Sequence, residues 1–273
     1  MTAIDLPPAA FAFDAIAEGF DERFGPWLSV SAQRRVVRTA LQRAFPPGTH
    51  LLEIGGGTGE DAAWLLERDR RVLMTDVSPA MVRVASAKLA GYAGAETAVV
   101  AAEALEGLAD ERQASGLPRL DGAYSNFAAL NCVSDLRPFA RGLARLVKPG
   151  ATTMLVLFGA ACPGEIIVEA LRGRPAAMVR RFHRGDAPAR LGGQSFTVRY
   201  HRRRDLTRAL APWFQPEGRQ GVGVFVPPSA AEPWISRRPR LLAALERLDH
   251  ALAGPLAVFG DHILYRFVRT DAA

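Results

Sequence analysis

The segment LLEIGGGTGED, residues 51–61, constrains the fold more than any other part of the chain. Its apolar residues Leu51, Leu52 and Ile54 predict a short buried strand that ends at a run of glycines, and a helical pattern resumes at Glu60. Glycine allows the backbone to approach a ligand closely, and the unpaired N–H groups of a helix start point toward it. A strand, a glycine-rich turn and a helix in this order predict a cradle for a nucleotide-like ligand in an α/β fold.

The spacing of the glycines indicates which ligand the cradle holds. Gly55, Gly57 and Gly59 follow the pattern G-x-G-x-G, and Glu53 lies inside the preceding strand. Dinucleotide sites instead use G-x-G-x-x-G, with a pyrophosphate on the helix N-terminus. The segment resembles motif I of the class I S-adenosylmethionine-dependent methyltransferases, whose cofactor carries no phosphate. This resemblance implies S-adenosyl-L-methionine as the cofactor and S-adenosyl-L-homocysteine as the product.

The sequence downstream of the loop has the order of elements that this family shows. Residues 72–75 predict a second strand that ends in Asp76, where a carboxylate accepts hydrogen bonds from both ribose hydroxyls, roughly 20 residues after the loop. A helix is predicted to start at Ser78-Pro79. Three further strands at residues 97–101, 121–125 and 152–158, with a helix at 136–146, complete the pattern. The resemblance therefore covers roughly residues 50–160.

The resemblance also implies a set of cofactor-binding residues, taken from the loop and from the ends of the predicted strands. They are Glu53, Gly55, Gly56, Gly57, Gly59, Asp76, Val77, Met81, Ala102, Glu103, Asn126 and Phe127. Two of these have other interpretations that the sequence leaves open. Asp76 precedes a helix and is a possible helix cap, and Glu103 is a possible solvated loop carboxylate. No metal site is expected, because Cys132 and Cys162 lack metal-ligand spacing.

The family's fold is a Rossmann-like, mostly parallel sheet of seven strands with helices on both faces, in which the last strand is antiparallel between the fifth and the sixth. For this chain we expect a cofactor-binding core at residues 49–160. The sixth strand is predicted at 222–226 and the last at 262–268, with a further strand at 196–200 and a helix at 205–214. Two helical insertions, residues 164–184 and 238–252, are predicted to form a lid within the region 161–273, over the carboxyl ends of the strands.

Residues 1–48 are expected to form a helical cap. Small-molecule methyltransferases of this class often begin with an F-D-x-x-A-x-x-Y-D segment that folds over the cofactor. This chain carries Phe20 where a tyrosine is usual, so a hydroxyl group that would help to bind a ligand is absent. Phe20, Phe24, Trp27 and Asn131 are candidates for the substrate pocket, although core packing is an alternative for the three aromatic residues.

The reaction implied by the resemblance is an in-line displacement, in which a nucleophile attacks the sulfonium methyl group. Much of the rate of such a reaction comes from orientation and exclusion of water, so a catalytic residue is hard to identify from sequence. Asn131, Glu165 and His201 are our candidates. The remaining histidines, among them His262 beside Asp261, are interpreted as structural or surface residues.

The positive charge is a weaker indicator of function. The formal net charge is +6, and only Lys88 and Lys148 among the 34 basic residues are lysines, a skew that GC-rich coding produces without selection for binding. The arginines nevertheless cluster between residues 172 and 208, where a positive field would attract an anionic substrate or nucleic acid. The members of this arginine cluster are Arg172, Arg174, Arg180, Arg181, Arg184, Arg190, Arg199, Arg202, Arg203, Arg204 and Arg208.

Our interpretation of the whole chain is a cytoplasmic methyltransferase acting on a small molecule, with nucleic acid an unfavoured partner. No signal peptide is evident at the start, and no apolar stretch has the length of a membrane span. Two alternatives remain open. The arginine cluster would serve an RNA methyltransferase, and a methyltransferase fold that binds cofactor without transferring a methyl group would serve as an assembly subunit. The acceptor and the oligomeric state cannot be inferred from the sequence.

Overall fold

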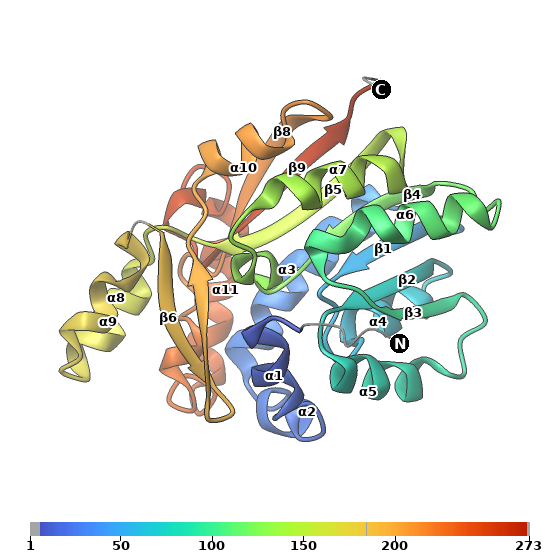
Figure 1. Ribbon diagram of the computed structural model, residues 1–273. Helices are drawn as coiled ribbons and strands as arrows, with labels where there is room; N and C mark the ends of the chain where they lie inside the picture. Colours follow the sequence, from blue (N-terminus) through green and yellow to red (C-terminus); the bar gives the residue numbers. More distant parts are fainter. Residues whose placement is uncertain (1–5, 184, 272–273) are drawn as a thin grey trace.

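The computed structural model describes residues 6–183 and 185–271 of the chain. Its centre is a seven-stranded sheet in the order β3-β2-β1-β4-β5-β9-β8 (Figure 1). The strands are β1 (His50–Ile54), β2 (Arg71–Asp76), β3 (Ala95–Val99), β4 (Leu120–Ser125), β5 (Val147–Phe158), β8 (Phe214–Val222) and β9 (His262–Arg269). The first five are parallel, and β9 is antiparallel to both of its neighbours. The predicted topology, with the last strand antiparallel between the fifth and the sixth, is confirmed.

Helices cover both faces of the sheet, which is why the central strands are apolar on both sides. On one face, Leu52 and Ile54 pack among residues of α6 (Leu105–Ala114), α7 (Leu136–Leu146) and α10 (Arg203–Leu210). On the other face, Leu51 packs among residues of α3 (Leu28–Ala44), α4 (Glu60–Leu66) and α5 (Pro79–Leu89). Successive residues of a strand point to opposite faces, so the short run LLEI supplies both cores.

The remaining elements lie outside the two helical layers. At the N-terminus are α1 (Pro8–Asp14) and α2 (Phe20–Phe24). After β5 come α8 (Pro163–Leu171), α9 (Pro175–Val179) and the hairpin β6 (Asp186–Leu191)–β7 (Gln194–Arg199), which pairs separately from the main sheet. The Phe13 and Phe196 rings, 6.2 Å apart, join the start of the chain to this hairpin. Between β8 and β9, α11 (Pro239–Leu252) packs on α3. Short 3₁₀ turns are η1 (Ala102–Ala104), η2 (Ala129–Cys132), η3 (Arg180–Phe182), η4 (Ser229–Ala231) and η5 (Ala257–Phe259).

The prediction of the sixth strand was wrong. The strand is Phe214–Val222, at the edge of the sheet, and not residues 222–226. Its middle is polar and exposed, so it lacks the apolar pattern by which a buried strand is recognised. Residues 223–226 form a turn instead, in which Gly223 has φ +69° and the N–H groups of Phe225 and Val226 donate to the Asp249 carboxylate.

Other boundaries differ by a few residues. The helix predicted at 205–214 is α10, which ends at Leu210, and the strand predicted at 97–101 is β3, which ends at Val99. Neither α6 nor β6 was predicted from the sequence. One end of the predicted lid segment 164–184, Arg184, lies outside the described residues. Across residues 6–183 and 185–271, no helix combines the length and hydropathy that crossing a bilayer requires.

Candidate active site

A cavity of about 590 Å³ lies at the carboxyl ends of β1, β2 and β4. Its floor includes the residues that follow these strands, and its upper wall comes from α1, α2 and the first turns of α3. The start of β9 closes one side with Asp261 and His262. Open α/β sheets bind their ligands at this edge, because neighbouring loops diverge there and leave a crevice.

The glycine-rich loop turns sharply beneath this cavity. Gly55, Gly57 and Gly59 have φ values of +68°, +58° and +79°, which L side chains rarely adopt. A Cβ on Gly55 would lie 2.2 Å from the Cβ of Ala129, whereas a Cβ on Gly57 would meet nothing within 4 Å. Gly57 lines the cavity, so its missing side chain leaves space for a ligand. Gly59 does not line the cavity. A Cβ there would lie 3.2 Å from Ala85, so this glycine permits close packing of α4 on α5.

Glu53 has a buried carboxyl group beneath the loop. The residue is 2% exposed, and its Oε2 atom makes no hydrogen bond with any described residue. Burial, and then the nearby charge of Asp61, raise the pKa of Glu53 well above its ordinary value. Because an unpaired buried carboxyl group costs free energy, a cationic group placed in the cavity would favour its ionised form. Glu53 is therefore suited to a ligand that carries an ammonium or sulfonium group.

Asp76 ends β2 and lines the same cavity. Its Oδ2 accepts a hydrogen bond of 2.9 Å from the Gly57 N–H, and its Oδ1 accepts one of 2.9 Å from the Ser78 N–H. Burial raises the pKa of Asp76 above its ordinary value despite these bonds. Ser78 itself caps α5 by accepting from the Met81 N–H, so the interpretation of Asp76 as the helix cap was wrong. Its carboxylate ties the strand to the loop and faces the ligand space.

The other predicted cofactor residues lie around this space. Ala102 and Glu103 line it from η1, where Glu103 is exposed. Asn126 donates from Nδ2 to the buried Asp61, 2.7 Å away, and Phe127 has φ +46°. Apart from Gly59, every predicted cofactor residue lines the cavity, including Val77 and Met81.

The N-terminal helices cover the cavity with aromatic side chains. Phe20, Phe24 and Trp27 all line it, with ring centroids 4.7 Å apart in the first pair and 4.9 Å apart in the second. Two carboxylates join these helices to the core. Asp14 accepts a hydrogen bond from the Ala80 N–H at 3.0 Å, and Asp21 accepts one from the Thr58 hydroxyl at 2.7 Å. Neither predicted lid insertion contributes a lining residue. The cover over the described cavity is N-terminal.

At the start of β9, His262 forms a cluster with Gln33 and Asp261. The His262 Nδ1 lies 3.2 Å from the Gln33 Oε1 and 3.4 Å from the Asp261 Oδ2, and the Gln33 Nε2 donates to the same Asp261 oxygen at 3.1 Å. The sequence indicated only that Asp261 and His262 are adjacent. Gln33 lies 229 positions from His262 in a helix of unrelated pattern, so no local signal identified it.

Comparisons with known proteins agree with this architecture. Residues 52–153 match the family model described as a methyltransferase domain. This match covers 102 of the 273 residues, so the core of the chain is similar to methyltransferase domains. The chain is 32% identical over 126 residues to the ubiquinone/menaquinone biosynthesis C-methyltransferase UbiE of Rubrivivax gelatinosus (strain NBRC 100245 / IL144). That match covers 46% of the chain and 45% of the relative, so the chain aligns with less than half of the relative's length.

Two solved structures show the same fold at low sequence identity. The Burkholderia thailandensis 1,6-didemethyltoxoflavin-N1-methyltransferase, with bound 1,6-didemethyltoxoflavin and S-adenosylhomocysteine, aligns with a TM-score of 0.54 at 16% identity over 99% of this chain and 94% of that one. The [4+2]-cyclase SpnF aligns with a TM-score of 0.52 at 17% identity over 87% and 80%. Since one of them is named as a cyclase, the fold alone does not determine the reaction.

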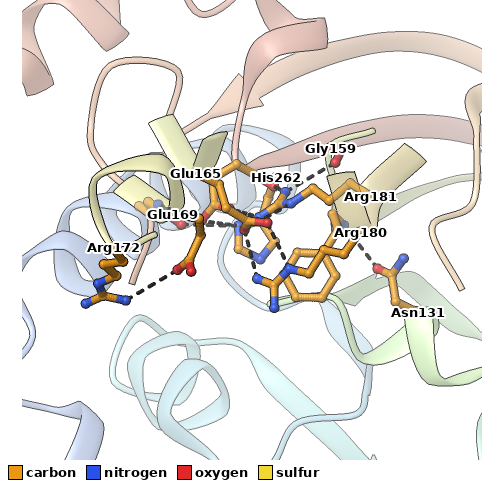
Figure 2. Close-up of polar contacts among 11 residues, drawn as sticks. Asn131, Gly159, Glu165, Glu169, Arg172, Arg180, Arg181 and His262 are labelled. Carbon is orange, nitrogen blue, oxygen red and sulfur yellow. Dashed lines mark hydrogen bonds and ion pairs between the residues drawn. The ribbon is translucent and has the colours of Figure 1, made fainter. Parts of the chain in front are cut away.

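The structure does not bring the three predicted catalytic residues to the cavity. Asn131 accepts from the Phe158 N–H with Oδ1 and donates from Nδ2 to the Arg199 carbonyl, so it ties loops together and is not a pocket residue (Figure 2). Glu165 is 3% exposed and paired with Arg180 and Arg181. The His201 Nε2 lies 2.7 Å from the Val133 carbonyl. The predictions of Asn131 and Glu165 rested on position after a strand, and that of His201 on its place in the predicted lid region; neither determines where a side chain points.

Six of the ten described members of the arginine cluster pair with nearby carboxylates, and Glu165 and Glu169 are each shared by two of them. Arg172 and Arg174 pair with Glu169, Arg180 and Arg181 with Glu165, Arg199 with Asp186, and Arg204 with Asp205. Figure 2 shows Glu169 beside Arg172, and Glu165 beside Arg180 and Arg181. More than half of the described cluster is therefore already engaged in ion pairs, which weakens the RNA alternative.

Proposed function

We propose that this methyltransferase transfers the methyl group of S-adenosyl-L-methionine to a small conjugated-ring molecule bound between the N-terminal aromatic residues and β9. The observation that carries the proposal is a single cavity lined both by the glycine-rich loop, Glu53 and Asp76 and by Phe20, Phe24, Trp27 and His262. The first group suits a charged nucleoside cofactor, and the second suits an apolar planar acceptor.

The residues around the loop fit the proposed cofactor. The unpaired Glu53 carboxyl group suits its ammonium group, the Asp76 carboxylate suits its ribose hydroxyls, and Glu103 suits the adenine amino group. Val77 and Met81 supply apolar contact for the adenine ring, and the space beside Gly57 admits the cofactor backbone. The bound cofactor supplies an electrophilic methyl group on a sulfonium.

The acceptor is proposed to be a small molecule because the cover is aromatic and more than half of the described arginine cluster is paired with carboxylates. The printed names of two similar proteins support this class: one is a C-methyltransferase of quinone biosynthesis, and the other is an N1-methyltransferase with a bound toxoflavin precursor. Their methylated atoms differ, so similarity does not select carbon, nitrogen or oxygen. The role of the chain in the reaction is to align acceptor and methyl group and to exclude water.

Calorimetry and a transfer assay test the proposal. We expect S-adenosyl-L-homocysteine to bind and NAD not to bind. Transfer of a radiolabelled methyl group to a panel of phenols, naphthols and aromatic N-heterocycles is then expected for at least one compound. Binding of NAD in place of S-adenosyl-L-homocysteine would contradict the cofactor. Cofactor binding without transfer to any compound, while a partner protein restores transfer, would favour the assembly-subunit alternative.

Hydrogen exchange tests which segment covers the cavity. If α1 and α2 form the cover, S-adenosyl-L-homocysteine should slow exchange in residues 8–27 more than in residues 164–183. We also predict that the two insertions become ordered when the acceptor binds together with the cofactor. Protection confined to the insertions would show that they, and not the N-terminal helices, close over the ligand.

A further inference from the structure

We propose that His262 is the general base of this enzyme and that Gln33 fixes it in the tautomer that can accept a proton. This inference rests on the proposed function and deepens it, because it selects an acceptor whose nucleophile forms by loss of a proton. A ring hydroxyl or a ring N–H group fits this requirement.

His262 occupies a place from which it can reach the acceptor. It is the first residue of β9, is 6% exposed and lines the cavity. Its ring stacks on Phe158 at 4.9 Å with an interplanar angle of 26°, and the Phe127 ring meets it edge-on at 5.8 Å. These contacts hold the imidazole plane in one orientation and leave Nε2 without a hydrogen-bond partner among the described residues.

The hydrogen bonds of Gln33 determine which nitrogen of His262 carries the proton. An ionised carboxylate only accepts hydrogen bonds, so the Gln33 atom 3.1 Å from Asp261 must be the amide nitrogen. The Gln33 oxygen therefore faces His262 Nδ1, and an amide oxygen also only accepts. Nδ1 must then carry the hydrogen. The lone pair of the neutral ring is on Nε2, the nitrogen that is free to meet the acceptor.

Buried charges behind Gln33 keep Asp261 ionised. Burial alone would raise the pKa of Asp261, but interactions with His262 and Arg181 hold this pKa well below its ordinary value. Arg181 donates to Asp261 Oδ1 at 2.5 Å, and it also pairs with Glu165 at the same distance. Figure 2 shows the Arg181 side chain reaching toward Glu165, beside His262. The Asp261 carboxylate 3.4 Å from Nδ1 would stabilise the imidazolium that forms when Nε2 takes a proton.

The proposed step conserves atoms and charge. As the acceptor oxygen or nitrogen bonds to the methyl carbon, its proton passes to His262 Nε2, and the electron pair of the broken C–S bond stays on sulfur. A ring hydroxyl that loses its proton also places charge on conjugated ring carbons, so the same base would serve carbon methylation. His262 then returns the proton to solvent when product leaves.

The tautomer can be tested without turnover, by ¹⁵N NMR of the protein labelled at histidine. We expect His262 to be protonated at Nδ1 in the neutral wild-type protein, and we expect this preference to weaken in Gln33→Leu, which keeps only the Asp261 acceptor, 3.4 Å from Nδ1. His250→Gln, in the exposed late helix, is the matched control and should leave the His262 signals unchanged. A neutral His262 protonated at Nε2, or an unchanged tautomer in Gln33→Leu, would overturn the assignment.

Kinetics measure how much His262 contributes to the methylation rate, with any phenol, naphthol or heterocycle that the wild type methylates as the acceptor. Loss of a general base costs about 10²–10⁴-fold, so His262→Gln should lower kcat in this range while S-adenosyl-L-homocysteine still binds normally. His250→Gln should keep wild-type kcat. If His262→Gln retains wild-type kcat with normal cofactor binding, the base is wrong but the proposed function stands. If neither protein binds S-adenosyl-L-homocysteine, the proposed function itself fails.

Discussion

The residues proposed to bind the cofactor, here called the cofactor side of the cavity, and those proposed to meet the acceptor, here called the acceptor side, are built in different ways. The glycine-rich loop and Asp76 are joined by a hydrogen bond from the Gly57 N–H to the Asp76 carboxylate, between residues 19 positions apart, and the loop conformation depends on glycines with positive φ. The His262 side depends on side chains brought together over 80 to 229 positions: Arg181 with Asp261, and Gln33 with His262. A site held by local backbone geometry is readable in sequence, whereas a site held by distant buried charges is not.

The largest effect should follow from breaking the buried charge cluster. Arg181→Met leaves Glu165 and Asp261 buried without their central partner, so the free energy of unfolding should fall by about 3–5 kcal/mol in urea titrations at neutral pH. Arg180→Met is the matched control. Arg180 pairs with the same Glu165 but has a side chain 51% exposed, so its loss should cost about 0–1 kcal/mol. Equal losses in both variants would show that burial does not distinguish them.

The same variant should alter the response to acid. Hydrogen bonds from Arg180 and Arg181 outweigh burial and lower the pKa of Glu165, and the pKa of Asp261 is also lowered. Stability from carboxyl groups with depressed pKa values is fully present above their unfolded values near about 4 and is lost as the pH falls below them. The difference in unfolding free energy between wild type and Arg181→Met should therefore shrink below about pH 4. A constant difference down to acid pH would contradict this origin.

On the cofactor side, a change at Asp76 should affect binding. Asp76→Ala removes the carboxylate proposed to hold the ribose, so the affinity for S-adenosyl-L-homocysteine should fall by about 1–3 kcal/mol in calorimetry, toward the upper end because the group is charged. Asp110→Ala, on the exposed side of α6, is the control and should bind normally. Unchanged affinity in Asp76→Ala would show that this carboxylate does not contact the cofactor.

A smaller effect separates backbone strain from ligand contact within the loop. Gly57 and Gly48 both have positive φ, and a Cβ on either would meet nothing within 4 Å, but only Gly57 lines the cavity. Gly57→Ala and Gly48→Ala should each lower the unfolding free energy by about 1–2 kcal/mol. Cofactor affinity should fall only in Gly57→Ala. A comparable loss of affinity in Gly48→Ala would trace the effect to global destabilisation.

The smallest expected effect concerns the arginine cluster. Single-stranded RNA bound through this cluster would lose affinity with a slope near −0.7 per phosphate contact against log salt. Because most of the described cluster is paired with carboxylates, we expect only weak retention that disappears by about 0.2 M salt. Replacing Arg202, Arg203 and Arg204 with alanine should then change little. Tight binding that survives this salt concentration and is lost in the triple variant would favour the RNA alternative.

The sequence predicted the sheet most accurately where its strands are central. Leu51, Leu52 and Ile54 are buried between helices on both faces, so their apolar run is a strong signal. The edge strand β8 was misplaced because one side of an edge strand faces solvent and requires no apolar pattern. The candidate catalytic residues Glu165 and His201 were chosen by their position in the chain. In the structure, Glu165 forms a buried ion pair with Arg181, and His201 forms a buried hydrogen bond with the Val133 carbonyl.

By itself, the sequence determined the cofactor side: the glycine spacing, Glu53 and Asp76 lie within a short segment, and positive φ values permit few residues other than glycine. Only the tertiary structure decided the acceptor side. It brought Gln33 from α3 against Asp261 and His262 at the start of β9, placed Arg181 behind them, and made the N-terminal helices the cover of the cavity. The reason is that a hydrogen bond between distant side chains leaves no local periodicity, so its partners are identified only when the chain has folded.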